Sequence, residues 1–505
     1  MTWTWLLLVL LAILGIISYL FIVQRVTAIT RTPAWLLWIV VMMPAFCMVF
    51  WTLLFGSKPG MPPLIGISLF IGCFFLYLYL IQRGKITPDP NATLPGMTRS
   101  PGDNSELPVE PLPEAMIPRP INPAEETNLQ NCFPWSVFYL QHIEYRPQAV
   151  ICKGQLRTGA EQAYQTVRAN IEAEFGDRFY LVFQEGVNQK PFFALVPNPQ
   201  AQTPALVSSS VNLRRPRVAI ALALLTLITT TWSGWELSQL LGAPKSLPLW
   251  QGLPFALALM GFFIIREGGH YWTTLHYKIP ATLPYFIPIV PLPQLPIGTV
   301  GAFIQLRSPI PHRKALFDVG VVGALMGLIF AILLLGVGLT LSKTVTIPTD
   351  FRPSVFKFEA IVPQYSLLLT LLSKIALGGQ LTGKMLIKMH PIAVAGWLGL
   401  LFTAFNLMPI GQLDGGRMVH AIYGQRTGAI IGQIARLLLL GLSLMQPHLL
   451  LWAILLFLLP AVDEPALNDV TELDNRRDTI GLVALGLLLI IILPTPKIVL
   501  NALGL

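Results

Sequence analysis

The sequence predicts an all-α polytopic membrane bundle of about ten transmembrane helices, with a small α+β module inserted on the cytosolic side. Apolar residues make up 54% of the 505 residues and charged residues 12%, which leaves too little polar surface for a water-soluble protein. Apolar windows of about 17 residues or more recur along the chain, each long enough to cross a hydrocarbon core as a helix. Polar, alternating stretches near residues 129–198 interrupt these windows and are too short to span a bilayer.

Charge and cysteine content exclude several other classes of protein. The net charge of +9 comes mainly from Lys and Arg near the ends of the apolar windows, where these side chains contact anionic membrane lipids. The sequence has no dense basic cluster with interleaved aromatic residues, so nucleic acid is not an expected partner. Four scattered cysteines are too few for a disulfide framework or a CxxC metal site.

Residues 1–83 are expected to form three transmembrane spans. Their apolar windows lie roughly at residues 3–23, 34–55 and 62–82. The first window has no basic region before it and no clear small-residue cleavage site after it, which favours a retained span over a signal peptide. Basic residues mark the side that the positive-inside rule assigns to the cytoplasm, namely Arg25, Arg31, Arg83 and Lys85.

Residues 84–128 are expected to form a disordered linker, and residues 129–215 a cytosolic α+β module. The linker holds ten prolines among polar residues and cannot bury a core. In the module, runs rich in aromatic and branched residues predict strands at 137–142, 149–156, 179–185 and 192–197. Apolar residues at four-residue steps predict a helix over 160–175, which Gly176 ends.

Residues 216–478 are expected to form a membrane core, and residues 479–505 a final span and tail. The apolar windows lie near 218–233, 252–277, 319–342, 391–410, 427–445, 447–461 and 480–494. Eight prolines interrupt the apolar stretch 280–311, which excludes a continuous helix and indicates a re-entrant or interfacial loop buried against protein. An extramembrane stretch at 343–390 contains an amphipathic piece at 365–377.

Two separated segments place ionisable groups at the ends of apolar spans. Glu267 and His270 are three residues apart, so they lie near one another on one face of a helix. The second segment carries Asn406, Pro409 and Asp414. Ionisable groups at such depth are costly, and they indicate a functional site. With the module inside, the predicted topology brings both segments to the same side of the membrane at similar depth.

Several neighbouring residues have simpler interpretations. Gly415 and Gly416 are expected to be turn glycines. The glycines of the intervening span indicate close helix packing rather than catalysis; they are Gly320, Gly323 and Gly327. Taken alone, the sequence Arg266-Glu-Gly-Gly-His270 is also typical of a solvated helix end, and its interest comes from the Asp414 segment that accompanies it.

These segments resemble the site-2 protease family of intramembrane zinc metalloproteases, peptidase family M50. That family uses H-E-x-x-H on one helix and an L-D-G type segment on another. Glu267, His270 and Asp414 match this pattern. The resemblance implies that His270 and Asp414 are zinc ligands and that Glu267 is the general base, with Asn406, Pro409 and Gly415 in supporting positions.

The resemblance narrows to the cyanobacterial and plastid branch, the ethylene-dependent gravitropism-deficient and yellow-green-like proteases. Members carry G-N-L-R-G, F-G-D and K-P-x-x-x-x-V-P segments before the protease core. This chain has Gly-Gln-Leu-Arg at 154–157, Phe-Gly-Asp at 175–177, and Lys-Pro with Val-Pro within 190–197. The resemblance covers roughly residues 129–477. It implies a multi-pass protein in the plasma or thylakoid membrane of a photosynthetic cell, such as a cyanobacterium.

The chain departs from the family pattern at Arg266, which stands where the first zinc-binding histidine belongs. A guanidinium stays protonated, offers no lone pair and would repel a metal ion. His270 and Asp414 then supply two ligands, whereas catalytic zinc sites have three protein ligands and a water. Other histidines lack convincing spacing for a substitute ligand; they are His276, His312 and His420. We expect Arg266 to pair with Asp414 or Glu267 in place of the metal.

Three classes of function follow. The first is a catalytically impaired or inactive homologue, a pseudoprotease that binds membrane-spanning clients or regulates proteolysis. The second is an active intramembrane zinc metalloendopeptidase, a hydrolase that carries out regulated intramembrane proteolysis with an unidentified third ligand. The third is a transporter, which is disfavoured because the sequence shows no internal repeat. Membrane lipids and a transmembrane protein are the expected partners, and zinc is the expected cofactor only of the active form.

Overall fold

The computed structural model describes most of the chain after residue 120. The described residues are 32–55, 121–198 and 215–505, except for 147–148, 187–189, 243, 245, 292–296, 347–360, 383–384, 446–448 and 461, together with single positions between 19 and 83. The chain divides into two compact units, residues 1–111 and residues 112–505, and each is described by itself.

The first unit contains helix α2 (Ala34–Phe55), which corresponds to the second expected span. Leu37 is fully buried in it, and the hydroxyl of Thr32 donates a hydrogen bond to the carbonyl of Leu80 at 2.8 Å. The spans expected at 3–23 and 62–82 lie outside the described residues apart from single positions.

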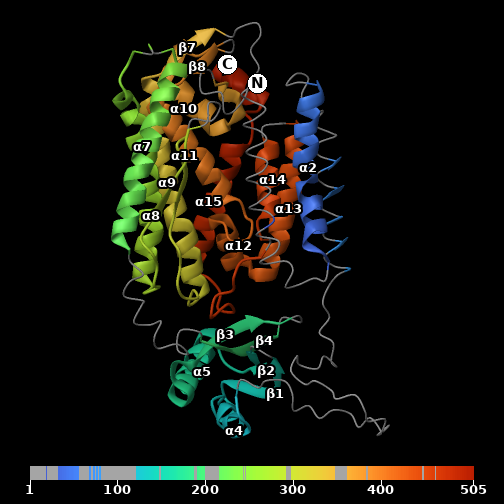
Figure 1. Ribbon diagram of the computed structural model, residues 1–505. Helices are drawn as coiled ribbons and strands as arrows, with labels where there is room; N and C mark the ends of the chain where they lie inside the picture. Colours follow the sequence, from blue (N-terminus) through green and yellow to red (C-terminus); the bar gives the residue numbers. More distant parts are fainter. Residues whose placement is uncertain are drawn as a thin grey trace, which may run out of the picture. The chain divides into compact units, whose positions relative to one another are not determined.

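The second unit begins with the α+β module, whose strands form one antiparallel sheet in the order β1-β2-β4-β3 (Figure 1). The strands are β1 (Phe138–Arg146), β2 (Ala149–Leu156), β3 (Phe179–Glu185) and β4 (Pro191–Pro197). Helix α5 (Ala160–Phe175) has the predicted bounds, and its stripe of Ala163, Val167 and Ile171 is buried. Stacked and edge-on aromatic rings fill the core, including Phe183 against Phe193 at 4.1 Å. The helix and the four strands are thus confirmed, with β1 extending four residues beyond its prediction.

The linker expected over 84–128 ends earlier in the structure, because helix α4 (Pro123–Asn131) occupies its last residues. Glu125 accepts a hydrogen bond from the backbone N–H of Asn122, and Pro123 stands at the first helical position. Leu129 is fully buried in the module core. Local capping and one buried leucine therefore order a segment whose composition predicts a linker.

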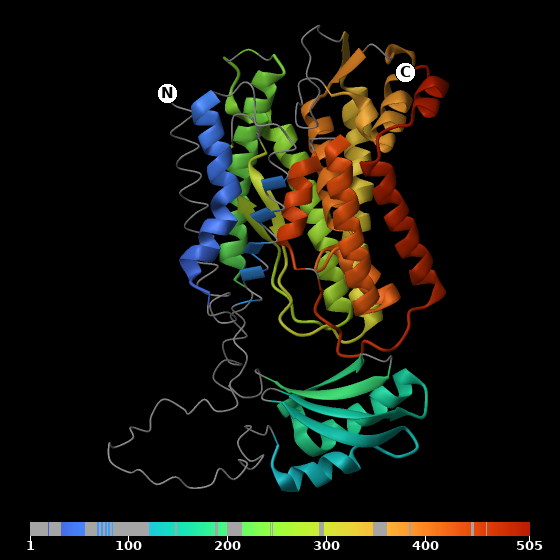
Figure 2. The same ribbon diagram turned by 90° about the vertical axis from the view of Figure 1, so that its right-hand side faces the viewer.

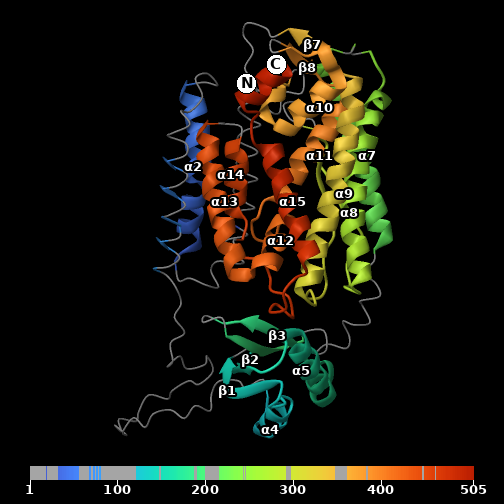
Figure 3. The same cartoon turned by 180° about the vertical axis from the view of Figure 1, so that it is seen from behind.

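The membrane core is a helical bundle around α8, α9 and α11 (Figures 1 and 3). Its longer helices are α7 (Pro216–Leu240), α8 (Leu253–His276), α9 (Arg313–Thr340), α11 (Pro391–Leu407), α13 (Gln425–Met445) and α15 (Asn475–Ile492). Its shorter helices are α10 (Leu367–Leu377), α12 (Asp414–Tyr423), α14 (Leu450–Leu458) and α16 (Lys497–Leu503). Trp397 of α11 is 2% exposed and belongs to the apolar core of the bundle.

By length and apolar composition, three helices of the described part could cross a membrane, or four if the bent pair α15 and α16 counts as one span. The three are 216–240, 249–276 and 313–340. The structure is mostly helical, as predicted, but the expectation of about ten spans is not confirmed.

The proline-rich stretch 280–311 forms a hairpin of two short strands, β5 (Tyr285–Pro288) and β6 (Thr299–Phe303), which lies among the helices in Figure 2. Its described residues contain no helix, as the prolines predict. Gly298, at φ +76°, brings this loop against α7, where its carbonyl accepts a hydrogen bond from the Thr229 hydroxyl at 2.7 Å. A second short antiparallel pair, β7 (Lys343–Thr346) with β8 (Met385–Lys388), was not predicted.

Candidate active site

Helix α8 carries three ionisable side chains into the interior of the bundle. Arg266 is 8% exposed, Glu267 2% and His270 5%. The i to i+3 and i to i+4 spacings place His270 one turn after Glu267 and Arg266, on the side of α8 that packs against α9. The face of α8 that carries the resemblance is therefore buried against protein.

Asp414 is the first residue of α12, and a sharp turn after α11 positions it. Pro409 lies in this turn, where Gly411 adopts φ +49°. A Cβ atom at Gly415 would lie 1.9 Å from the carbonyl oxygen of Leu407, so only glycine lets α12 start against the end of α11. Gly415 and Gly416 lie within α12 and allow close packing there, so their prediction as turn glycines was wrong.

Helix α9 makes room for the site through glycines. A Cβ atom at Gly323 would lie 2.4 Å from the His270 ring, and one at Gly327 would lie 3.2 Å from the Arg266 side chain. At Gly320 the nearest atom would be the Asp414 carbonyl oxygen at 2.9 Å. The predicted role of these glycines in close packing is confirmed, and what they pack against is the candidate site itself.

Arg266 joins the two segments that carry the site. Its Nη2 donates a hydrogen bond to Asp414 Oδ2 at 2.5 Å, and its Nη1 donates to Glu267 Oε1. All three groups are at least nine-tenths buried, so each charge depends on the others for compensation. The guanidinium thus bridges the carboxylates of α8 and α12.

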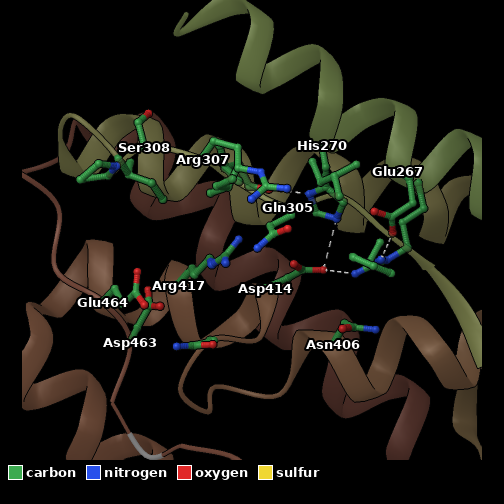
Figure 4. Close-up of a pocket in the computed structure, with 18 of the residues that line it drawn as sticks. Glu267, His270, Gln305, Arg307, Ser308, Asn406, Asp414, Arg417, Asp463 and Glu464 are labelled. Carbon is green, nitrogen blue, oxygen red and sulfur yellow. Dashed lines mark hydrogen bonds and ion pairs between the residues drawn. The ribbon is translucent and has the colours of Figure 1, made fainter. Parts of the chain in front are cut away.

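His270 is oriented for a ligand but faces the same ion pair. Its Nδ1 donates a hydrogen bond to the carbonyl of Val319 at 2.7 Å, which fixes the ring and leaves Nε2 directed at Asp414. The Nε2 atom lies 3.6 Å from Asp414 Oδ2. In Figure 4, Asp414 points toward His270 and Glu267, so the predicted groups converge.

A cavity of about 670 Å³ opens beside these residues. The rest of its lining comes from the 302–310 part of the hairpin loop, from Val319 of α9, from the 406–417 region and from the 463–465 segment. Figure 4 shows Asp463 and Glu464 approaching from the side opposite Glu267. Asn406 lines the cavity too, but its side-chain N–H donates to the carbonyl of Phe402 at 2.8 Å.

Sequence reasoning missed part of this lining, including Gln305, Arg307, Arg417, Asp463 and Glu464. Arg417 could have been predicted from the sequence, since it stands about one helical turn after Asp414 and would lie on the same face of a helix. The acidic pair at 463–464 follows an apolar helix and carries no spacing that connects it to Asp414. Only the tertiary structure places it at the cavity.

The comparisons with known proteins agree with this geometry. Residues 254–445 match Peptidase family M50, and residues 127–204 match the EGY3 middle domain. The predicted resemblance to this peptidase family is therefore confirmed over these residues.

Three proteins similar to this chain come from plants. The chain is 33% identical to the "Probable zinc metalloprotease EGY1, chloroplastic" of Arabidopsis thaliana, over 48% of this chain and 43% of the relative. It is 28% identical to the EGY2 protein of the same description and plant, over 72% of this chain and 63% of the relative. It is 24% identical to the EGY3 protein of Oryza sativa subsp. indica over the same shares. The predicted branch is therefore confirmed, although the chain spans less than two thirds of these relatives, and no solved structure matches it.

The relatives are named as zinc metalloproteases, but the residues present in this chain do not fit a catalytic zinc ion. His270 Nε2 and Asp414 Oδ2 could hold one ion between them, yet the Arg266 guanidinium is bonded to Asp414 there. Among the residues that the structure describes, no group of three or more His, Cys, Asp or Glu is arranged to hold a metal.

The other histidines do not complete the site. His420 is bonded to Asp469, and His312 accepts a hydrogen bond from the backbone N–H of Ala315. The His276 ring packs against Tyr277. Each of the three alternatives weighed from the sequence is thus engaged elsewhere.

Proposed function

We propose that this chain does not hydrolyse peptide bonds, and that its cavity holds a segment of a membrane-spanning polypeptide. One observation carries the first half of the proposal: the Arg266 guanidinium is hydrogen-bonded to both Glu267 and Asp414. A fixed cation at this place supplies the positive charge that the carboxylates need and repels a divalent ion.

The ion pair also opposes the use of Glu267 as a base. A general base must reach a water or substrate proton and accept it. Glu267 instead accepts a hydrogen bond from Arg266 and is 2% exposed. Proton transfer to this carboxylate would leave Arg266 with only Asp414 as a counterion.

The retained cavity supports binding without cleavage. It keeps a mixed lining of amide, guanidinium and carboxylate groups beside apolar residues of the hairpin loop. Such a lining can hydrogen-bond the backbone of a polypeptide segment that leaves its helical conformation inside the membrane. A protein of this kind would present or shield clients for other proteases.

Metal analysis of purified full-length protein tests the proposal. The unmodified chain is expected to carry almost no zinc, whereas Arg266→His restores a third ligand and is expected to approach one zinc ion per chain. Arg417→His, in the same cavity but away from His270, is the matched control and should bind none. Stoichiometric zinc in the unmodified chain that disappears in His270→Ala would overturn the proposal.

A second candidate is an active zinc endopeptidase, which the names of the relatives support. Incubation with a model transmembrane helix separates the two candidates. Cleavage by the unmodified chain that stops in Glu267→Gln would establish activity. Uncleaved helix retained by both proteins is the outcome that the first candidate predicts.

We further propose that the protein resides in the thylakoid or plasma membrane of a photosynthetic cell, with the module on the cytoplasmic or stromal side. The relatives carry the description chloroplastic, and the apolar helices of the core require a membrane. Immunoblotting of fractionated membranes, with protease added from one side, tests both statements.

A further inference from the structure

Residues 463–469 connect three parts of the second unit, and we call them the strap. On the module side, the backbone N–H of Phe183 donates to the carbonyl of Leu467 at 2.6 Å. The N–H of Asp469 in turn donates to the carbonyl of Phe183 at 2.9 Å. Asn468 and Phe183 thereby form a parallel β-bridge. The strap therefore continues the sheet beyond β3, its outer strand.

The same residues also form one wall of the cavity. The backbone N–H groups of Leu467 and Asn468 donate to the carbonyls of Ile310 and Pro311 at 2.9 and 3.0 Å. Asp463, Glu464 and Pro465 line the cavity directly, as does Ile310. The residues that pair with β3 and the residues that line the cavity thus belong to one continuous segment of seven residues.

Buried charges fasten the strap to the helices of the site. Asp469 accepts a hydrogen bond from Arg313 Nε, at the start of α9, at 3.1 Å. It also accepts one from His420 Nε2 of α12 at 3.1 Å, and His420 Nδ1 lies 3.5 Å from Asp463 Oδ2. All four side chains are less than 9% exposed. Removing one charge from such a group leaves the others uncompensated, so the strap cannot shift without disturbing α9 and α12.

We propose that the strap couples docking of the α+β module to the state of the cavity. When β3 separates from residues 467–469, the wall at 463–465 loosens, and so does the end of α12 at His420, the helix whose first residue is Asp414. Reciprocity requires that a polypeptide filling the cavity strengthens module docking by the same free energy. A partner that binds or releases the module would thereby regulate the site, whether or not the site binds zinc.

Hydrogen exchange on the full chain in detergent tests this coupling. Asp469→Asn is expected to raise exchange at least tenfold in β3 and in residues 304–311, while β1 at the far edge of the sheet keeps its rate. Glu472→Gln is the matched control, because Glu472 is exposed and lies three residues after Asp469. Faster exchange in the strap alone, with β3 and residues 304–311 unchanged, would overturn the proposal.

Asn468→Ala covers the case in which Asp469→Asn does not accumulate. It removes hydrogen bonds to Thr471 at 2.8 Å and Glu161 at 3.3 Å without unpairing a buried charge. We expect about a threefold rise in the same two regions. If β1 exchanges as fast as β3 in this variant, the module is unfolding rather than undocking, and the coupling is refuted. Neither zinc nor a client enters this measurement, so its failure is distinct from failure of the proposed function.

Discussion

Arg266 turns a metal-binding pattern into an ion pair. The neighbouring groups still converge, since Glu267 and His270 of α8 and Asp414 of α12 meet around the Arg266 guanidinium. The His270 ring even keeps Nδ1 bonded to a carbonyl, which is how metal-binding histidines are usually oriented. One buried side chain with a permanent charge therefore holds both carboxylates of the site.

Replacing Arg266 with methionine should show how strongly the carboxylates depend on it. Two buried carboxylates would lose their shared counterion, at a cost of about 3–5 kcal/mol. We expect a lower melting temperature for Arg266→Met in detergent, measured by tryptophan fluorescence. Adding Glu267→Gln and Asp414→Asn removes the unpaired charges and should recover most of the loss. A single variant as stable as the unmodified chain would contradict this account of the ion pair.

Two glycines of α9 offer a matched comparison. Gly323→Ala would place a methyl group 2.4 Å from the His270 ring, and such overpacking costs about 1–3 kcal/mol. Gly336 lies on the same helix, and a methyl group added there would meet no atom within 4 Å. Gly336→Ala should therefore be neutral or stabilising by up to about 1 kcal/mol. Thermal unfolding of both variants measures the difference. Equal melting temperatures would argue against a packed His270.

At the scale of elements, the site depends on where helices begin and end. Helix α12 can start at Asp414 because Gly415 lies against the last carbonyls of α11, and it ends shortly after His420. The strap then holds this second end through His420. Both ends of one short helix are thus tied to other parts of the bundle.

The tie at His420 should make stability depend on pH. Burial alone would lower the pKa of this imidazole, but the adjacent carboxylates of Asp463 and Asp469 raise it from 6.5 to about 9. Because the folded protein holds the proton more tightly, the stabilisation is complete below about pH 6.5. It declines by about 1.4 kcal/mol per pH unit as the pH rises toward 9.

His420→Gln tests this dependence. Denaturant unfolding between pH 6 and pH 9.5 should show the decline in the unmodified chain and a flatter profile in the variant. The charged groups around position 420, which are Arg313, Asp463 and Asp469, are the same in both proteins, so the difference between the profiles reports on His420. Parallel profiles would show that His420 does not carry the proton.

At the scale of the whole molecule, an apolar surface surrounds the buried polar site. Large apolar side chains of several core helices are more than 50% exposed, among them Ile220, Ile228, Leu257, Ile329, Leu333 and Leu437. Such a surface is stable only against lipid or detergent. The polar groups face inward, as expected for ionisable residues of membrane proteins.

A lysine on this surface should be costly. Leu333 lies in α9 and is 58% exposed. Leu333→Lys is expected to destabilise the inserted protein by about 2.5–3.5 kcal/mol, less if the side chain reaches the interface. Leu333→Met is the control and should have little effect. The folded fraction after detergent extraction, followed by size-exclusion chromatography, measures both, and equal yields would contradict a lipid-facing position.

The sequence by itself determined features that depend on local pattern. Four-residue periodicity placed α5, branched and aromatic runs placed the module strands, and long apolar windows placed α8 and α9. The pairing of the Glu267 and Asp414 segments was also predictable, because both stand at the ends of apolar windows. Capping at Asn122 was visible too, but proline-rich composition outweighed it, so α4 was missed.

Only the tertiary structure decided which groups meet across long separations in the chain. Arg266 and Asp414 are 148 residues apart, and Arg313 and Asp469 are 156 apart. The sequence left open whether Arg266 would pair with Glu267 or with Asp414, and the fold pairs it with both. Periodicity fixes which face of a helix a residue occupies, whereas the partner of a buried charge depends on how whole helices pack. For that reason the strap and the cavity wall have no counterpart in the sequence patterns.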